Sequence, residues 1–250
     1  MTFLNRWDDD RARPTLSEAG RDLAVRVAAP MTVWWLVVLA IGWGLTDGPL
    51  KELGTREERF NKWLASGRTS VLDTITLVFS WTGATVSIIG VCLVVVAAVW
   101  WRTRRWWYAV VPLIAISAQA LVFFFTTLLI DRERPHVEKL DDSPPTSSFP
   151  SGHTGAATGL YFTLALMALR IKHPGLRSLV VTVCLFVPLL VASARLYRGM
   201  HHLSDVIVAI VNGLIAGLLA WGWLRAGSAG PDAPARVDEA GERSEAQTRA

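Results

Sequence analysis

Long apolar stretches alternate with short polar ones along most of the chain. Each apolar stretch is close to the ~20 residues that a helix needs to cross ~30 Å of hydrocarbon. The pattern therefore predicts an all-α integral membrane bundle of six transmembrane helices. These helices are expected at residues 28–45, 74–101, 106–130, 153–169, 179–194 and 203–224.

The segments outside the bundle differ in character. Residues 1–27 are mostly polar and are expected to form a cytoplasmic N-terminal segment before the six-helix domain of residues 28–225. Residues 226–250 are rich in small, charged and proline residues without apolar periodicity, which predicts a disordered cytoplasmic tail. The loop of residues 46–73 mixes aromatic and charged residues, so we interpret it as a short surface helix that covers the outer side.

Composition supports a membrane protein. Hydrophobic residues make up 52% of the chain and charged residues only 18%, which is more apolar side chain than one soluble core normally buries. Nothing after the first apolar stretch resembles a signal-peptide cleavage site, so we expect this stretch to remain as an anchor. Cys92 and Cys184 lie in apolar stretches far apart in sequence and predict neither a disulfide nor a metal site.

The positive charges indicate an orientation. Lysines and arginines are spread over every loop, so the net charge of +4 does not predict a nucleic-acid partner. Fifteen of them lie on the side that holds both termini and ten on the other side. The positive-inside rule then predicts both termini in the cytoplasm and a multi-pass protein of the cytoplasmic membrane. The oligomeric state has no signal in the sequence.

Three polar clusters stand at the ends of apolar stretches, and this topology puts all three on the outer side. Residues 131–135 follow the third stretch, residues 147–153 open the fourth, and residues 195–205 lead into the sixth. We therefore expect the three clusters to converge.

The second cluster has the pattern of an anion site. Ser151 and Gly152 form a turn that leads directly into an apolar helix, where unpaired backbone N–H groups point outward. Gly152 permits close approach of the backbone to a phosphate, because it has no Cβ. Ser151 is also compatible with a plain N-cap, and His153 with a surface histidine in the first turn.

The third cluster pairs histidine with aspartate. His201 and Asp205 are four residues apart, so a carboxylate on one helix face can fix one imidazole nitrogen and leave the other free to attack. His202 is three residues from Asp205 and fits the same pairing, so spacing alone does not choose between the two histidines. A helix end whose histidine and aspartate merely face water is the alternative interpretation.

Two arginines complete the candidate site. The planar guanidinium groups of Arg134 and Arg195 match phosphate oxygens, although each arginine alone is more typical of a residue that reaches the lipid head groups. The chain has no HExxH sequence and no set of Cys and His ligands, so we expect neither a metal nor a cofactor. The arginines and a helix N-terminus must then neutralise the transition-state charge.

These clusters resemble the motifs of the type 2 phosphatidic acid phosphatase (PAP2) family, which includes bacterial membrane lipid phosphatases and, more distantly, soluble vanadium haloperoxidases. The resemblance covers roughly residues 46–220. It implies that His201 is a nucleophile that becomes phosphohistidine, that His153 is the general acid and that Asp205 orients His201. The matching residues, in order, are Arg134-Pro135, Pro150-Ser151-Gly152-His153, Arg195, His201 and Asp205.

The resemblance also implies the phosphate ligands, namely Arg134, Arg195 and the backbone of Ser151 and Gly152. Two positions depart from the family pattern. Thr127 stands where a lysine is usual, and Ala194 where a serine is usual. We expect Arg132 to supply the charge of the missing lysine.

The implied function is hydrolysis of a lipid phosphate at the outer face of the membrane. The expected partners are this substrate and the surrounding membrane lipids. An isoprenoid diphosphate of the undecaprenyl or decaprenyl type is favoured as substrate, followed by phosphatidic acid or phosphatidylglycerol phosphate. A phosphotransferase that uses the same histidine is an alternative, and phosphorylated acceptor products would reveal it. A non-catalytic lipid carrier or lipid-binding protein is a further alternative, which the intact set of His153, His201 and Asp205 disfavours.

Small residues repeat at a spacing of four in two of the predicted helices. Gly155 and Gly159 lie in the fourth, and Ala209, Gly213 and Gly217 in the sixth. The repeats predict close packing of these two helices.

Overall fold

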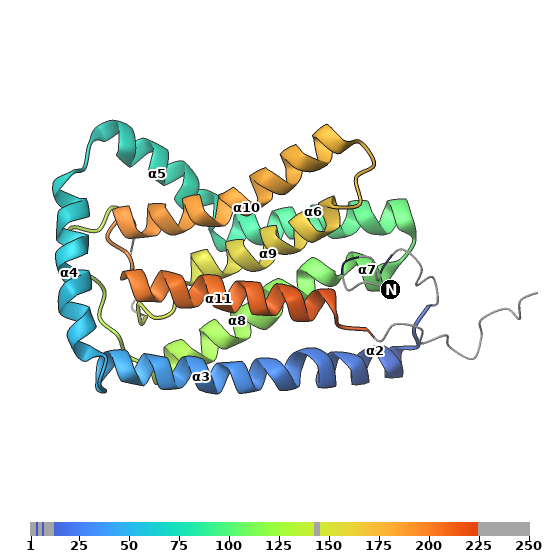
Figure 1. Ribbon diagram of the computed structural model, residues 1–250, viewed down its shortest axis with the longest axis horizontal. Coiled ribbons are helices and arrows are strands. Elements are labelled where there is room, and N and C mark those ends of the chain that lie inside the picture. The colour runs from blue at the N-terminus through green and yellow to red at the C-terminus, as the bar shows by residue number, and fades with distance from the viewer. Residues whose placement is uncertain (1–3, 5–6, 8–12, 143–145, 225–250) are drawn as a thin grey trace, which may run out of the picture.

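The computed structural model describes residue 4, residue 7, residues 13–142 and residues 146–224. Within these residues the chain consists of helices and connecting loops (Figure 1), so the predicted all-α class is confirmed. The principal elements are α2 (Leu16–Leu23), η2 (Ala24–Ala28), α3 (Ala29–Thr46), α4 (Lys51–Ser66), α5 (Ser70–Thr82), α6 (Thr85–Thr103), α7 (Trp106–Ala109), α8 (Val111–Leu129), α9 (Gly152–Ala168), α10 (Pro174–Tyr197) and α11 (Leu203–Trp221).

The chain is a multi-pass membrane protein. Five helical segments of the described residues are long and apolar enough to cross a membrane, and the predicted tail lies outside those residues. Helix α9 is slightly shorter, with 17 residues, and runs through the interior between α8, α10 and α11 (Figure 1). The predicted number of six is therefore approximate. The five segments are Leu16–Thr46, Thr85–Thr103, Val111–Leu129, Pro174–Tyr197 and Leu203–Trp221.

The first helix begins earlier than its apolar stretch. Elements α2, η2 and α3 form one continuous helical segment from Leu16, whereas the sequence predicted a start at residue 28. Thr15 and Glu18 form a capping box, in which the threonine hydroxyl accepts the Glu18 N–H and the Glu18 carboxylate accepts the Thr15 N–H. The prediction was late because hydropathy marks the part of a helix inside the membrane, whereas capping marks where the helix begins.

The second apolar stretch is two helices and not one. Helices α5 and α6 are separated at Gly83, and a Cβ added there would lie 2.6 Å from Cγ1 of Val191 and 3.4 Å from Cβ of His153. The glycine therefore permits this bend to pack directly against α10 and the first turn of α9.

The predicted packing of α9 against α11 is confirmed. A Cβ at Gly213 would lie 2.5 Å from Cβ of Thr158 and 2.8 Å from the carbonyl oxygen of Gly155, so the two backbones approach as closely as glycine allows. This contact fixes the helix that begins at Gly152 against the helix that carries Asp205.

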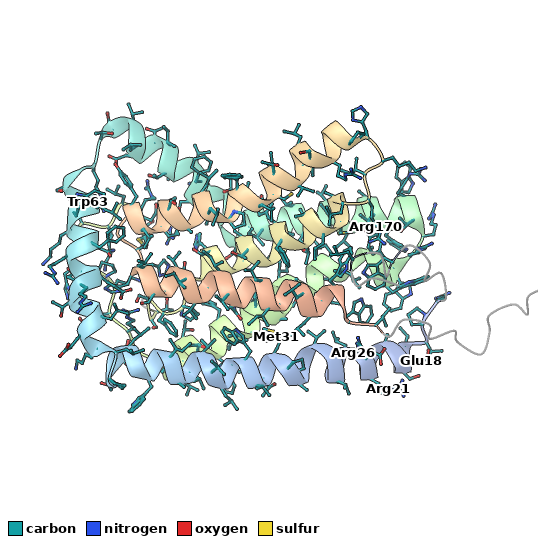
Figure 2. The ribbon with its side chains drawn as sticks, viewed as in Figure 1. Glu18, Arg21, Arg26, Met31, Trp63 and Arg170 are labelled. Atoms are coloured by element: carbon teal, nitrogen blue, oxygen red, sulfur yellow. The ribbon has the colours of Figure 1, made fainter. Side chains whose placement is uncertain are left out.

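The predicted surface helix is α4, which lies across one end of the bundle (Figure 1). Trp63 of α4 is 66% exposed at this end, whereas Arg21, Arg26 and Arg170 lie towards the opposite end (Figure 2). The start of α2 and the end of α11 share that opposite end (Figure 1). The loops that carry the three polar clusters therefore lie beside α4, at the end of the bundle away from these helix termini.

Candidate active site

The three clusters meet at a cavity of about 1060 Å³ beside the loop that follows α8. Arg134 comes from this loop, His153 from the first turn of α9, Arg195 from the end of α10, and His201 from the connection to α11. The structure thus brings together four residues that lie up to 67 positions apart in the sequence, as convergence on one side of the membrane requires.

The cavity continues from these polar groups along an apolar wall. That wall is formed by residues of α5, α6 and α8, so it runs between helices instead of ending at the polar loops. A ligand with a charged head and a long apolar tail matches both parts. The apolar lining includes Leu77, Trp81, Ile88, Ile89, Leu93, Leu113, Ile116, Phe123 and Phe124.

His201 is held by two hydrogen bonds, one from its ring and one to its backbone. Its Nδ1 lies 2.7 Å from the carbonyl oxygen of Ser148, and its own carbonyl oxygen accepts a hydrogen bond of 2.9 Å from the amide of Asn61. Because a carbonyl only accepts, Nδ1 carries the proton, and Nε2 is left with its lone pair. Ser148 is itself placed by its N–H, which donates to the carbonyl oxygen of Arg132 at 2.9 Å.

The surroundings of His201 favour the neutral ring. Burial lowers the pKa of His201 to about 4, the charges of Arg195 and Arg134 lower it further, and Asp205 opposes this effect. The ring is therefore uncharged at neutral pH, which is the state that a nucleophilic imidazole requires.

Asp205 lies beside both histidines without a side-chain hydrogen bond to either. Its Oδ2 is 3.8 Å from Nδ1 of His201 and 3.5 Å from Nδ1 of His202, and it accepts the backbone N–H of His202 at 2.8 Å. The carbonyl of Ser148, and not Asp205, is thus the direct acceptor for His201. His201 lines the cavity and His202 does not, a choice that spacing alone left open.

Both arginines of the cavity keep an unused donor. Arg195 donates from Nη1 to Ser80 Oγ at 2.7 Å and to Asp141, and Arg134 donates from Nη1 to the carbonyl oxygen of Met200 at 2.8 Å. The buried Nε of each has no acceptor among the described residues. Buried N–H groups without a partner are costly. Both guanidinium groups line the cavity, and their charge is suited to an anion there.

The first turn of α9 adds further donors. Ser151 is its N-cap residue, and no side-chain cap is formed there in the described part of the chain. Gly152 and His153 line the cavity, and a Cβ at Gly152 would lie 3.0 Å from the ring of Phe123. The positive end of the helix and its free N–H groups are suited to an anion.

Two of the predicted phosphate ligands are placed elsewhere. Ser151 does not line the cavity, because its N–H donates to the carbonyl oxygen of Asp205 at 3.1 Å and its hydroxyl donates to Thr154 at 3.0 Å. Arg132 does not line it either, because two carboxylates bind its guanidinium, those of Asp205 at 2.5 Å and Glu57 at 2.7 Å. The structure therefore does not bring Arg132 to the position of a substitute for the missing lysine.

Sequence reasoning missed several polar residues of the site. Asp141 pairs with Arg195 and with Arg198, the latter at 2.7 Å, and Lys139 lines the cavity beside it. Asp141 and Lys139 come from an irregular loop, and Ser80 from an apolar helix, where periodicity gives no signal. No group of three or more His, Cys, Asp or Glu residues in the described part of the chain is placed to hold a metal ion.

Comparison with known proteins finds a matching family model. Residues 106–228 match the model of the PAP2 superfamily. The chain matches no curated protein sequence.

Two crystal structures share the fold. A transmembrane PAP2 type phosphatidylglycerolphosphate phosphatase from Bacillus subtilis has a TM-score of 0.66 at 20% identity, over 79% of this chain and 95% of that one. LpxE from Aquifex aeolicus has a TM-score of 0.52 at 18% identity, over 66% of this chain and 93% of that one. The fold is thus shared with membrane phosphatases, and the resemblance to the PAP2 superfamily is confirmed over residues 106–228, which carry all three polar clusters.

Proposed function

We propose that this protein hydrolyses a phosphate ester or diphosphate on a membrane lipid through a phosphohistidine at His201. One observation carries the proposal. A single cavity holds a neutral imidazole with a free Nε2, two arginines with unused donors and an apolar wall that reaches between helices. These are the parts that attack on a phosphorus atom of an amphiphile requires.

In the first step of the proposed reaction, Nε2 of His201 attacks phosphorus. The new N–P bond forms as the bond between phosphorus and the leaving oxygen breaks. His153, on the same cavity, carries an extra proton in the substrate complex and gives it to that oxygen. In the second step a water molecule attacks the phosphohistidine and loses a proton to His153, which releases inorganic phosphate and restores both rings.

The charge of the transition state is carried by fixed donors. Arg134, Arg195 and the first turn of α9 surround the cavity and are in place before the substrate arrives. Donors that are preorganised around developing charge need no rearrangement at the moment of reaction. We therefore propose that the reaction needs no divalent metal.

The proposed substrates are lipids with a terminal phosphate group. An isoprenoid diphosphate of the undecaprenyl or decaprenyl type is favoured, and phosphatidic acid and phosphatidylglycerol phosphate come next. This order rests on analogy with the family. The apolar lining can contact the long hydrocarbon tail of each of these lipids. It carries no group that would recognise one lipid head over another.

The test is phosphate release by the protein purified in detergent. Isoprenoid and glycerolipid phosphates are supplied with excess EDTA, and we expect inorganic phosphate from at least one of them, with no loss on chelation. His201→Ala is the matched control for a contaminating phosphatase. Failure on every lipid of the panel would contradict the proposal, and an absolute requirement for Mg²⁺ or Zn²⁺ would contradict its metal-free mechanism.

A further inference from the structure

Glu57 is a buried carboxylate on a helix that is otherwise largely exposed. It lies in the middle of α4 and is 5% exposed. Its Oε2 accepts a hydrogen bond of 2.7 Å from Arg132, and its Oε1 accepts the backbone N–H of Ser204 at 2.6 Å. Burial of an ionised carboxylate is costly unless charged and hydrogen-bonded partners compensate it, and this carboxylate has both.

Arg132 joins this carboxylate to the catalytic end of α11. The Nη2 atom faces Glu57, and Nη1 donates to Asp205 at 2.5 Å and to the hydroxyl of Ser204 at 2.7 Å. One guanidinium therefore bridges a carboxylate of the covering helix and the carboxylate beside His201. The three charged side chains are each at most 6% exposed, so solvent screens them weakly.

We propose that Glu57 is a positioning residue that acts through Arg132 to keep the negative charge of Asp205 effective beside His201. This inference rests on the function proposed above. Arg132 alone would hold Asp205 in place but would also cancel its charge. With Glu57 present, the group of Glu57, Arg132 and Asp205 carries one net negative charge.

That charge matters when the nucleophile reacts. Nδ1 of His201 keeps its proton while Nε2 bonds to phosphorus, so the ring becomes cationic. Asp205, 3.8 Å away, stabilises the cationic ring to the extent that Arg132 does not neutralise it. Arg134, Arg195, His153 and His202 also surround His201 or Asp205, and they are unchanged in the variants below.

The charge of the group predicts opposite effects for two single variants. Glu57→Gln makes the group neutral, so protonation of His201 becomes harder and its pKa falls. We expect the acidic limb of the kcat/KM profile to move to lower pH and kcat to fall by about tenfold, with a smaller change in KM. Arg132→Gln gives the group two negative charges, and we expect the limb to move to higher pH.

The double variant distinguishes an effect of the group's net charge from the loss of a structural link between α4 and α11. Glu57→Gln combined with Arg132→Gln restores one net negative charge, so we expect the limb at the wild-type position. A simple structural link would instead give lower activity in all three variants with no movement of the limb. Glu52→Gln on the exposed face of α4 is the matched control and should leave the profile unchanged.

The experiment is a set of pH profiles with one lipid substrate for the wild type and these variants, each checked for folding by its melting temperature. Opposite shifts of the limb in the single variants support the inference. If one single variant does not fold, the other single variant and the double variant still predict different limb positions. Unmoved limbs with an active wild type overturn the role of Glu57 and leave the proposed function standing, whereas a wild type inactive on every lipid overturns both.

Discussion

His201 and His202 are adjacent in the chain but have different surroundings. His201 lines the cavity and donates to the carbonyl of Ser148, whereas His202 is the N-cap residue of α11 and does not line the cavity. Their positions in the sequence, four and three residues before Asp205, could not distinguish them. The structure agrees, because the Nδ1 atoms of both rings lie 3.5 to 3.8 Å from Oδ2 of Asp205. A backbone acceptor such as the Ser148 carbonyl is invisible in a sequence, since every residue has one.

Ion pairs between residues far apart in the chain could not be predicted from the sequence either. Arg132 was a reasonable candidate for the phosphate because it stands two residues before Arg134. Its partner Glu57 lies 75 positions away on α4, and no motif connects them. By contrast, Arg134, His153, Arg195 and His201 were predictable, because each belongs to a polar cluster at the end of an apolar stretch.

At the scale of residues, His153→Ala should reduce activity in a way that depends on the leaving group. A lipid monophosphate needs its leaving oxygen protonated, so we expect a loss of ~10²-fold or more. A p-nitrophenyl ester already has a good leaving group and should lose much less. Parallel kcat/KM measurements on the two substrates check this, and an equal loss on both would mean that His153 positions phosphate instead of donating a proton.

Helices were more predictable than their ends and breaks. Hydropathy located the apolar part of every long helix, because the membrane requires it. It missed the polar first turns from Leu16, where a capping box marks the start, and the break at Gly83, which packs closely against Val191. Both features depend on local hydrogen bonds or tertiary contacts, which a mean hydropathy does not record.

At the scale of elements, Gly213→Ala should destabilise the contact of α9 with α11. The added methyl group would lie 2.5 Å from Cβ of Thr158, and overpacking of this kind typically costs ~1–3 kcal/mol. Gly90→Ala on α6 is the matched control, because a Cβ there meets nothing within 4 Å. Melting temperatures in detergent measure the difference, and equal values for the two variants would contradict close packing at Gly213.

At the scale of the whole molecule, the polar clusters of the proposed site and the two ends of the helical domain lie at opposite ends of the bundle. The loops that carry the three polar clusters lie at the end of the bundle that α4 crosses, whereas the start of α2 and the end of α11 lie at the other (Figure 1). Combined with the excess of Lys and Arg on the side of the termini, this arrangement supports the proposal that the reaction takes place at the outer face. The proposed orientation therefore rests on the distribution of charge, and the separation of the proposed site from the helix termini rests on the fold.

Sidedness is tested by cysteine labelling in intact cells. Thr146→Cys, in the exposed loop beside the cavity, should react with an impermeant thiol reagent. Lys172→Cys, in the loop between α9 and α10, should react only after lysis, and the buried Cys92 and Cys184 make the unmodified protein a suitable blank. The reverse pattern would place the reaction in the cytoplasm.

The central claim is a covalent phosphohistidine at His201, and trapping that intermediate tests it most directly. The protein is mixed with a lipid substrate labelled in the transferred phosphate and quenched within one turnover. We predict a labelled protein whose phosphate is stable in alkali and lost in acid, present in His202→Ala and absent from His201→Ala. Label that persists in His201→Ala, or that disappears only in His202→Ala, would contradict the account.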